Sequence, residues 1–244
     1  MDFSGKVVLV TGGASGIGAC SVEEFLKSGV KGVLIADVSD GQELAQKLNE
    51  KYGSGRVTFV KTDVTDENSF DNAFQQAVKQ YGNIDILLNC AGLMDEVKWK
   101  KLYQVNVIGT IGTVTGCQLA IEKYFPKHKN GDKAYIINIA SVIGLTRSFG
   151  ENKIVLDQGI CMLVLCPGLT DTPLIAGLNA ETLTYIDLLE AEKSAFVTQS
   201  PQAVAKAAVE ILEKGESGSV WIIDTNELYQ IKLPKYEDLK SLRI

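Results

Sequence analysis

The sequence is poor in the residues and patterns that mark several large classes of protein. It has a single histidine, His128, and no Cys-x-x-Cys pair, which excludes a histidine-rich or zinc-ribbon metal site. Only 5 of its 244 residues are proline and 45% are hydrophobic, so the chain is neither disordered nor collagen-like. No uncharged apolar run reaches the roughly 18–20 residues of a membrane span, and the opening residues do not predict a signal peptide.

Positive charge is also in short supply. The 24 Lys and Arg residues are outnumbered by 30 Asp and Glu, giving a net charge of −6. A protein that grips a phosphate backbone is typically basic, so nucleic acid is not expected as a partner. The five cysteines are odd in number and lie mostly in apolar runs, which indicates buried thiols in a reducing compartment. The expected location is therefore cytoplasmic.

Short apolar runs alternate with longer amphipathic patterns along the chain. The runs predict buried β-strands, and the patterns between them predict helices. The predicted strands span residues 6–11, 32–37, 56–61, 84–89, 134–140, 160–166 and 219–223. The predicted helices span residues 17–27, 41–52, 66–81, 99–124 and 200–214, with Pro126 following the fourth.

This alternation predicts an α/β fold with a doubly wound parallel sheet of the Rossmann type. No linker or repeat divides the chain, so we expect a single domain over residues 1–244. Within it, residues 1–140 form a nucleotide-binding half, residues 141–225 a shortened catalytic and substrate half, and residues 226–244 a polar tail.

A glycine-rich turn follows the first predicted strand, in the order Thr-Gly-Gly-Ala-Ser-Gly-Ile-Gly from residue 11 to 18. Glycine at positions 12, 16 and 18 lets the backbone turn tightly and approach a pyrophosphate, which the N–H groups of the next helix can bind. Such a turn alone is also compatible with an ordinary tight strand-to-helix connection. The second strand, however, ends in Asp37, 19 residues after Gly18. A carboxylate there can accept bonds from ribose hydroxyls and would repel a 2′-phosphate, which favours NAD over NADP.

Further motifs follow in order, and together they resemble the short-chain dehydrogenase/reductase family. The turn fits the family's TGxxxGxG motif, and Asp63-Val64 resembles the pair that contacts adenine. Residues 89–92 (NCAG) resemble NNAG, with Cys90 replacing the second Asn. Residues 167–172 (PGLTDT) resemble the PGxxxT motif that holds the nicotinamide end. The opening of the chain looks most like the branch of NAD-linked 15-hydroxyprostaglandin dehydrogenases and insect alcohol dehydrogenases.

The resemblance implies an NAD(H)-dependent oxidoreductase acting on a secondary alcohol or ketone, with hydroxy lipids and prostaglandin-like molecules among the candidate substrates. It implies catalytic roles for Ser141 and Asn106, no metal, and a homodimer or tetramer. The cofactor-binding residues that it implies are Gly12, Ser15, Gly16, Ile17, Gly18, Asp37, Asp63, Val64, Asn89, Ala91, Gly92, Pro167, Gly168 and Thr170.

One expected pair is missing. The family uses a Tyr, on the helix that follows the Ser, to exchange a proton with the substrate. A Lys one helical turn later lowers the pKa of that Tyr. Thirteen residues after Ser141 the chain has Ile154, and the Lys position is Gln158. No Tyr lies between Tyr135 and Tyr185. The Tyr-x-x-x-Lys at Tyr236–Lys240 lies in the tail, where a solvated helix is the simpler interpretation.

The spacing favours a deletion. Ser141 and Pro167 are 26 residues apart, which is shorter than the family's corresponding stretch, so we expect a shortened crossover helix between the fifth and sixth strands. In the family this helix takes part in the dimer interface, which we expect to be weakened here. A skipped exon and a gene-model error would both produce such a gap.

Two hypotheses of different class remain. The first is an active or weakly active dehydrogenase in which another group supplies the proton. The second is a catalytically silent NAD-binding isoform or a regulatory partner of intact subunits, which the missing pair favours. Lys153 lies near the missing site and is a candidate contact for the cofactor ribose. Tyr185 belongs to the stretch after PGxxxT, which in the family forms a flexible substrate lid, although an amphipathic helix with no substrate role explains it nearly as well. Cys90 fits a buried core thiol better than a nucleophile.

Overall fold

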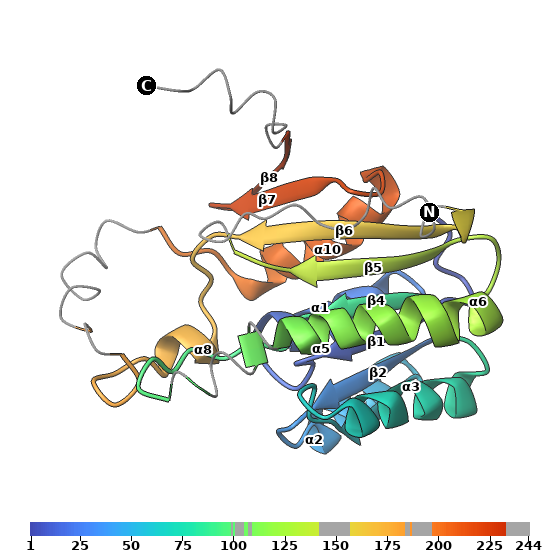
Figure 1. Ribbon diagram of the computed structural model, residues 1–244, viewed down its shortest axis with the longest axis horizontal. Helices are drawn as coiled ribbons and strands as arrows, with labels where there is room; N and C mark the ends of the chain where they lie inside the picture. The colour runs from blue at the N-terminus through green and yellow to red at the C-terminus, as the bar shows by residue number, and fades with distance from the viewer. Residues whose placement is uncertain are drawn as a thin grey trace.

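The computed structural model describes residues 1–98, 100, 105–106, 109–141, 157–183, 186 and 197–232. They form one eight-stranded sheet in the order β3-β2-β1-β4-β5-β6-β7-β8. All neighbouring strands are parallel except β7 and β8 (Figure 1). The strands are β1 Val7–Thr11, β2 Gly32–Asp37, β3 Val57–Lys61, β4 Ile86–Asn89, β5 Ala134–Ile139, β6 Ile160–Pro167, β7 Val220–Asp224 and β8 Glu227–Ile231.

Helices cover both faces of this sheet, as Figure 1 shows. They are α1 Gly16–Lys27, α2 Gln42–Tyr52, α3 Glu67–Tyr81, α5 Gly109–Gln118, η2 Leu119–Tyr124, α6 Phe125–His128, α8 Pro173–Ala176 and α10 Pro201–Lys214. The prediction of a single doubly wound α/β domain is therefore confirmed. Within the described residues, none of the helices is both long enough and apolar enough for a transmembrane segment.

The first strand illustrates why the sheet is buried on both sides. All five residues of β1 are buried, and successive side chains point to opposite faces. Val8 and Val10 pack in a core with Phe25 of α1, which also contains residues of α10. Val7 and Leu9 pack in the core of the other face with Phe70 and Phe74 of α3. The uninterrupted apolar runs of the sequence thus reflect two cores that share one sheet.

Local signals explain the helix ends near these cores. Asp66 accepts hydrogen bonds from the N–H groups of Asn68 and Ser69 at the start of α3, and Gly82 ends that helix with φ +84°. Ser200 accepts from the N–H of Ala203 at the start of α10, where proline follows in the first turn. Both helices therefore have favourable start signals, and α3 also has a favourable stop.

Two expectations about the fold are wrong. The predicted helix 99–124 does not continue as an α-helix to its end, because Leu119–Tyr124 form a π-helix. The helical path then continues into α6, where Pro126 lies in the first turn and its missing N–H costs nothing. The strand over 219–223 is also not the last one, because β8 follows within the expected polar tail. Thr225 and Asn226 reverse the chain before it with φ of 48° and 64°.

Candidate active site at the carboxyl ends of the strands

The glycine turn after β1 is a close-packed backbone junction. A Cβ atom on Gly18 would lie 2.1 Å from the carbonyl oxygen of Gly12. A Cβ atom on Gly12, which has φ +64°, would lie 2.8 Å from the Cα of Ala91. Neither position can hold a side chain unless the backbone moves. The turn therefore presents bare backbone at the start of α1, as close approach to a pyrophosphate requires.

The N-terminus of α1, the positive end of its helix dipole, is not neutralised by a side-chain cap or an acidic residue. Ser15 occupies the N-cap position with φ −149°, yet its side chain makes no capping hydrogen bond. The first turn, which contains Ile17, carries no acidic residue. The first N–H groups of a helix have no partner within the helix and carry a partial positive charge. This terminus, enclosed by the glycine turn, fits an anionic group such as a pyrophosphate.

Asp37 ties the end of β2 to the glycine turn. One oxygen of its carboxylate accepts from the N–H of Ala14 at 3.0 Å, and the other accepts from the N–H of Ser39 at 2.9 Å. The side chain is only partly buried, so its oxygens retain capacity for ribose hydroxyls. At the end of the neighbouring β3, Asp63 accepts from the N–H and hydroxyl of Thr65, and Val64 is buried beside it.

The segment after β4 is held against the glycine turn. The hydroxyl oxygen of Thr11 accepts from the N–H groups of Cys90 and Ala91 at 3.0 and 3.1 Å. Asn89 donates to the side-chain oxygen of Asn138 on β5 at 2.9 Å, so it joins two strands inside the sheet. Burial raises the pKa of the Cys90 thiol to about 12, which keeps it protonated and argues against a nucleophilic role.

Asn106 lies beside this segment. Its side-chain oxygen accepts from the N–H of Leu93 at 2.8 Å, and its side-chain nitrogen donates to the carbonyl of Leu93 at 2.5 Å. A Cβ atom on Gly92 would lie 3.6 Å from the same side-chain oxygen. Ser141 follows β5, one residue after Ala140, whose N–H donates to Leu165 of β6. Both predicted catalytic residues therefore follow the carboxyl end of a central strand.

The loop after β6 completes the arrangement. Thr172 lies against the glycine turn, because a Cβ atom on Gly16 would lie 3.5 Å from its side chain. At the loop's other end, Gly168 follows Pro167 and donates its N–H to the carbonyl of Ile223 at 2.8 Å. The hydroxyl of Thr170 is directed back to the carbonyl of Gly168 at 2.9 Å. Three predicted motifs, far apart in sequence, thus meet around the start of α1.

Several residues weighed in the sequence cannot be placed. Lys153, Ile154, Tyr185 and the Tyr236–Lys240 pair lie outside the described residues. Gln158, at the expected Lys position, lies two residues before β6 begins, where its backbone carbonyl accepts from the side chain of Lys129. That is the amino end of the strand, opposite the glycine turn.

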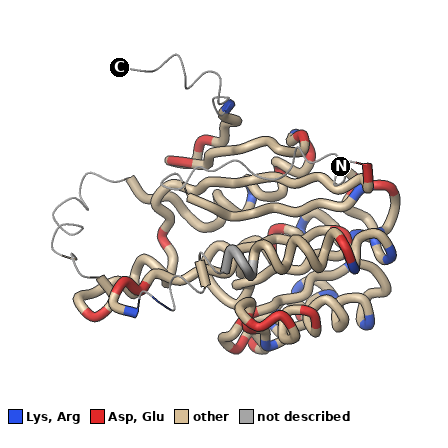
Figure 2. Tube along the Cα trace, viewed as in Figure 1, with Lys and Arg blue, Asp and Glu red and all other residues tan. Residues whose placement is uncertain are grey.

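The amino ends of the strands carry a different feature, a hollow of about 570 Å³ lined by Gly5, Lys31, Tyr81, Asn83 and the residues 127–130. Lys and Arg gather on this side of the molecule, around α6 (Figure 2). The Lys31 ammonium donates to the carbonyl of Tyr81 at the end of α3 and approaches Asn83. Lysine at a helix C-terminus neutralises the helix dipole, so this cluster is explained without a ligand. Among the described residues, no group of His, Cys, Asp or Glu is placed to hold a metal ion.

Sequence reasoning missed two residues of the candidate site. Gln199, just before α10, contacts the loop after β6. Asp224 occupies the space beside Gly168, because a Cβ atom on Gly168 would lie 1.9 Å from its side-chain oxygen. The sequence held one indication of this contact, the glycine of the Pro167-Gly168 pair, because glycine often occurs where another group approaches the backbone closely.

Comparison with known proteins agrees with this geometry. The chain is 29% identical over 238 residues to 15-hydroxyprostaglandin dehydrogenase [NAD(+)] of Rattus norvegicus, covering 87% of this chain and 88% of that protein. It is 27% identical over 251 residues to alcohol dehydrogenase 2 of Ceratitis cosyra, covering 95% and 96%.

Solved structures share the fold. A 3-ketoacyl-(acyl-carrier-protein) reductase of Brucella melitensis, complexed with NADH, matches with a TM-score of 0.70 at 22% identity, covering 91% of this chain and 97% of that one. A short chain dehydrogenase/reductase of Burkholderia phymatum, in complex with NAD, matches with a TM-score of 0.71 at 21% identity, covering 92% and 90%. The family model for the short chain dehydrogenases matches residues 6–153, more than half of the sequence. With the glycine turn, the Asp37 carboxylate and the loop after β6 meeting at one edge of the sheet, this chain belongs to the short-chain dehydrogenase family.

Proposed function

We propose that this chain binds NAD(H) at the carboxyl ends of its strands and descends from oxidoreductases acting on secondary alcohols or ketones. The observation that carries the proposal is the glycine turn. Gly12 and Gly18 leave no space for a Cβ atom, and they lead into a helix whose N-cap side chain makes no capping bond. The pyrophosphate would lie against the turn and residues 15–17. The ribose hydroxyls would bond to the Asp37 carboxylate, which disfavours a 2′-phosphate and so favours NAD(H) over NADP(H).

The remaining cofactor contacts follow from the motifs. Asp63 and Val64, at the end of β3, would receive the adenine. Asn89, Ala91 and Gly92 would line the middle of the dinucleotide, and Pro167, Gly168 and Thr170 its nicotinamide end. When bound, NAD⁺ supplies a hydride acceptor. A secondary alcohol or ketone is the substrate class, with hydroxy lipids and prostaglandin-like molecules as candidates.

The substrate chemistry of this chain would rest on two side chains. The Ser141 hydroxyl would donate a hydrogen bond to the substrate oxygen, and Asn106 would support a water near the same site. Neither group is a base of suitable pKa, so neither can accept the proton of the alcohol. We therefore propose that turnover is impaired. The alternative is a catalytically silent NAD-binding isoform, or a regulatory partner of intact homodimeric or tetrameric subunits. It is supported by Ile154 at the expected Tyr position and by Gln158 lying at the amino end of β6.

The proposal is tested by isothermal titration of the purified protein with NADH and NADPH, with oxidation of a panel of secondary alcohols assayed on the same sample. We expect micromolar binding of NADH, weaker binding of NADPH and little turnover. Rapid turnover would reject both the hypothesis of impaired turnover and that of a catalytically silent isoform. Absence of NADH binding would reject the cofactor site itself. The cytoplasmic location is tested separately, by imaging the tagged chain in cells.

A further inference from the structure

Gln199 is a polar side chain buried at the edge of the candidate site. It is 2% exposed and directly precedes Ser200, the N-cap residue of α10. Burying an amide is unfavourable unless its donors and acceptor find partners. The position of those partners shows what this side chain holds.

The amide of Gln199 joins two separate segments. Its nitrogen donates to the carbonyl of Ile223, at the end of β7, at 2.8 Å, and lies 3.4 Å from the hydroxyl of Thr170. Its oxygen accepts from the N–H of Asn226, in the turn between β7 and β8, at 3.3 Å. One side chain thus connects the loop after β6 to the β7–β8 hairpin.

The backbone of Gln199 holds the same loop. Its N–H donates to the carbonyl of Leu169, and its carbonyl accepts from the N–H of Asp171, both at 2.9 Å. Thr170 and Gln199 form an isolated parallel β-bridge. The loop is therefore fastened on one side to Gln199 and the hairpin, while Thr172 at its other end touches the glycine turn.

We propose that Gln199 is a positioning residue, which fixes the loop of residues 168–172 in the conformation that receives the nicotinamide half of the dinucleotide. This inference rests on the proposed NAD(H) function. The adenosine half would be bound by the turn at residues 12–18, which follows β1, and by Asp37 at the end of β2. Among the described residues, the hydrogen-bond partners of the Gln199 side chain lie in the loop after β6 and in the β7–β8 hairpin, not in those two segments. Its loss should therefore affect the two halves of the dinucleotide unequally.

The test compares NADH with ADP-ribose, which lacks the nicotinamide, in titrations of wild type and Gln199→Met. Methionine has a similar length but no amide, so the carbonyl of Ile223 and the N–H of Asn226 lose a partner. We expect the Kd for NADH to rise about tenfold, while the Kd for ADP-ribose stays within about twofold. The matched control is Gln230→Met, an exposed glutamine on β8, which should change neither value.

A second variant separates positioning from a general loss of structure. In Gln199→Glu the introduced carboxylate cannot donate to Ile223, whereas its protonated form can. The NADH affinity of this variant, relative to wild type at the same pH, should therefore improve as the pH falls from 8 to 5.5. Gln199→Met should show no such recovery.

The outcomes are distinct. Equal loss of NADH and ADP-ribose binding in Gln199→Met would overturn the inference in favour of a purely structural role, and loss of neither would overturn it as well. Wild type that binds ADP-ribose as tightly as NADH would show that the loop does not receive the nicotinamide. Wild type that binds neither ligand would instead reject the proposed function.

Discussion

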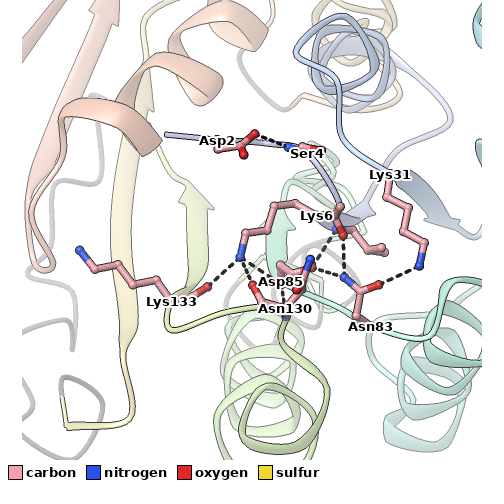
Figure 3. Close-up of polar contacts among 10 residues, drawn as sticks. Asp2, Ser4, Lys6, Lys31, Asn83, Asp85, Asn130 and Lys133 are labelled. Carbon is pink, nitrogen blue, oxygen red and sulfur yellow. Dashed lines mark hydrogen bonds and ion pairs between the residues drawn. The ribbon is translucent and has the colours of Figure 1, made fainter.

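The two ends of the sheet treat their carboxylates in opposite ways. At the amino ends, Asp85 is fully buried and accepts from the N–H groups of Val7 and Asn130, from the amide of Asn83 and from the Lys6 ammonium (Figure 3). At the carboxyl ends, Asp37 is partly exposed and accepts from two backbone N–H groups. The first carboxylate is saturated by its own protein, and the second keeps room for another partner. The difference separates a carboxylate that stabilises the fold from one that can still accept hydrogen bonds from a ligand.

The strongest way to break this comparison is to remove the saturated carboxylate. Asp85→Ala leaves a partly buried lysine and three other donors without their common acceptor, so we expect the free energy of unfolding to fall by about 3–5 kcal/mol. Denaturant unfolding of the cofactor-free protein measures it. The control is Asp37→Ala, for which the loss should be about 1 kcal/mol or less. Equal losses in the two variants would remove the distinction between the ends.

The glycine turn offers the next largest effect. Gly18→Ala forces a methyl group against the carbonyl of Gly12, and relieving such overpacking costs about 1–3 kcal/mol of stability. Because the turn must move, NADH affinity should fall by about tenfold to a hundredfold. Thermal unfolding and titration measure the two quantities. Gly92→Ala is the stability control, since its Cβ atom would meet one neighbour at an ordinary 3.6 Å. A stable Gly18→Ala protein with unchanged NADH affinity would contradict the proposed site.

Asp37 sharpens the comparison from the binding side. A hydrogen bond to a charged group contributes about 1.5–3 kcal/mol, so Asp37→Asn should weaken NADH binding by about tenfold to a hundredfold. The repulsion of a 2′-phosphate is lost at the same time, so NADPH affinity should change little or rise. Titration of both nucleotides gives the ratio. A parallel fall for NADH and NADPH would show that Asp37 does not contact the ribose.

The smallest effect concerns a thiol near the carboxyl ends, where Cys117 lies close to the amide of Asn89. Burial raises the pKa of Cys117 from 9.0 to about 12. Between these values the unfolded chain loses the proton and the folded chain keeps it. Stability is therefore lost as the pH rises, by about 1.4 kcal/mol per unit for this group. Denaturant unfolding from pH 7 to 10 should show a shallower alkaline decline in Cys117→Ala, with parallel curves below pH 8.5. Identical slopes up to pH 10 would show that this thiol does not stay protonated in the folded chain.

The sequence predicts those parts of the fold and site that depend on local patterns. The buried runs predicted the seven parallel strands. The turn at residues 12–18 was recognisable because its tight positions require glycine, which is visible in the sequence itself. β8 was missed because its residues, Glu-Leu-Tyr-Gln-Ile, form no apolar run and Thr225-Asn226 lacks the glycine of a typical hairpin turn. Its pairing with β7 is what orders it.

Gln199 shows the other limit. Its position before Ser200-Pro201 indicates only that a helix follows, and no neighbouring residue indicates that its side chain is buried in the site. Its role depends on Thr170, Ile223 and Asn226, which only the assembled sheet brings together. The π-helical end of the helix before Pro126 was likewise not visible, because residues 119–124 contain no glycine or proline that would mark a change of helix type.

The strand order also has a consequence for how the chain folds during synthesis. β1 to β4 and helices α1 to α3 lie within the first 89 residues and form one contiguous half of the sheet, so this half can assemble on the ribosome before the rest is made. Its core around Phe25 of α1, however, is shared with Val204 and Ala208 of α10. That apolar surface stays uncovered until α10 has been synthesised, more than a hundred residues later. Until then it is accessible to chaperones and to other nascent chains.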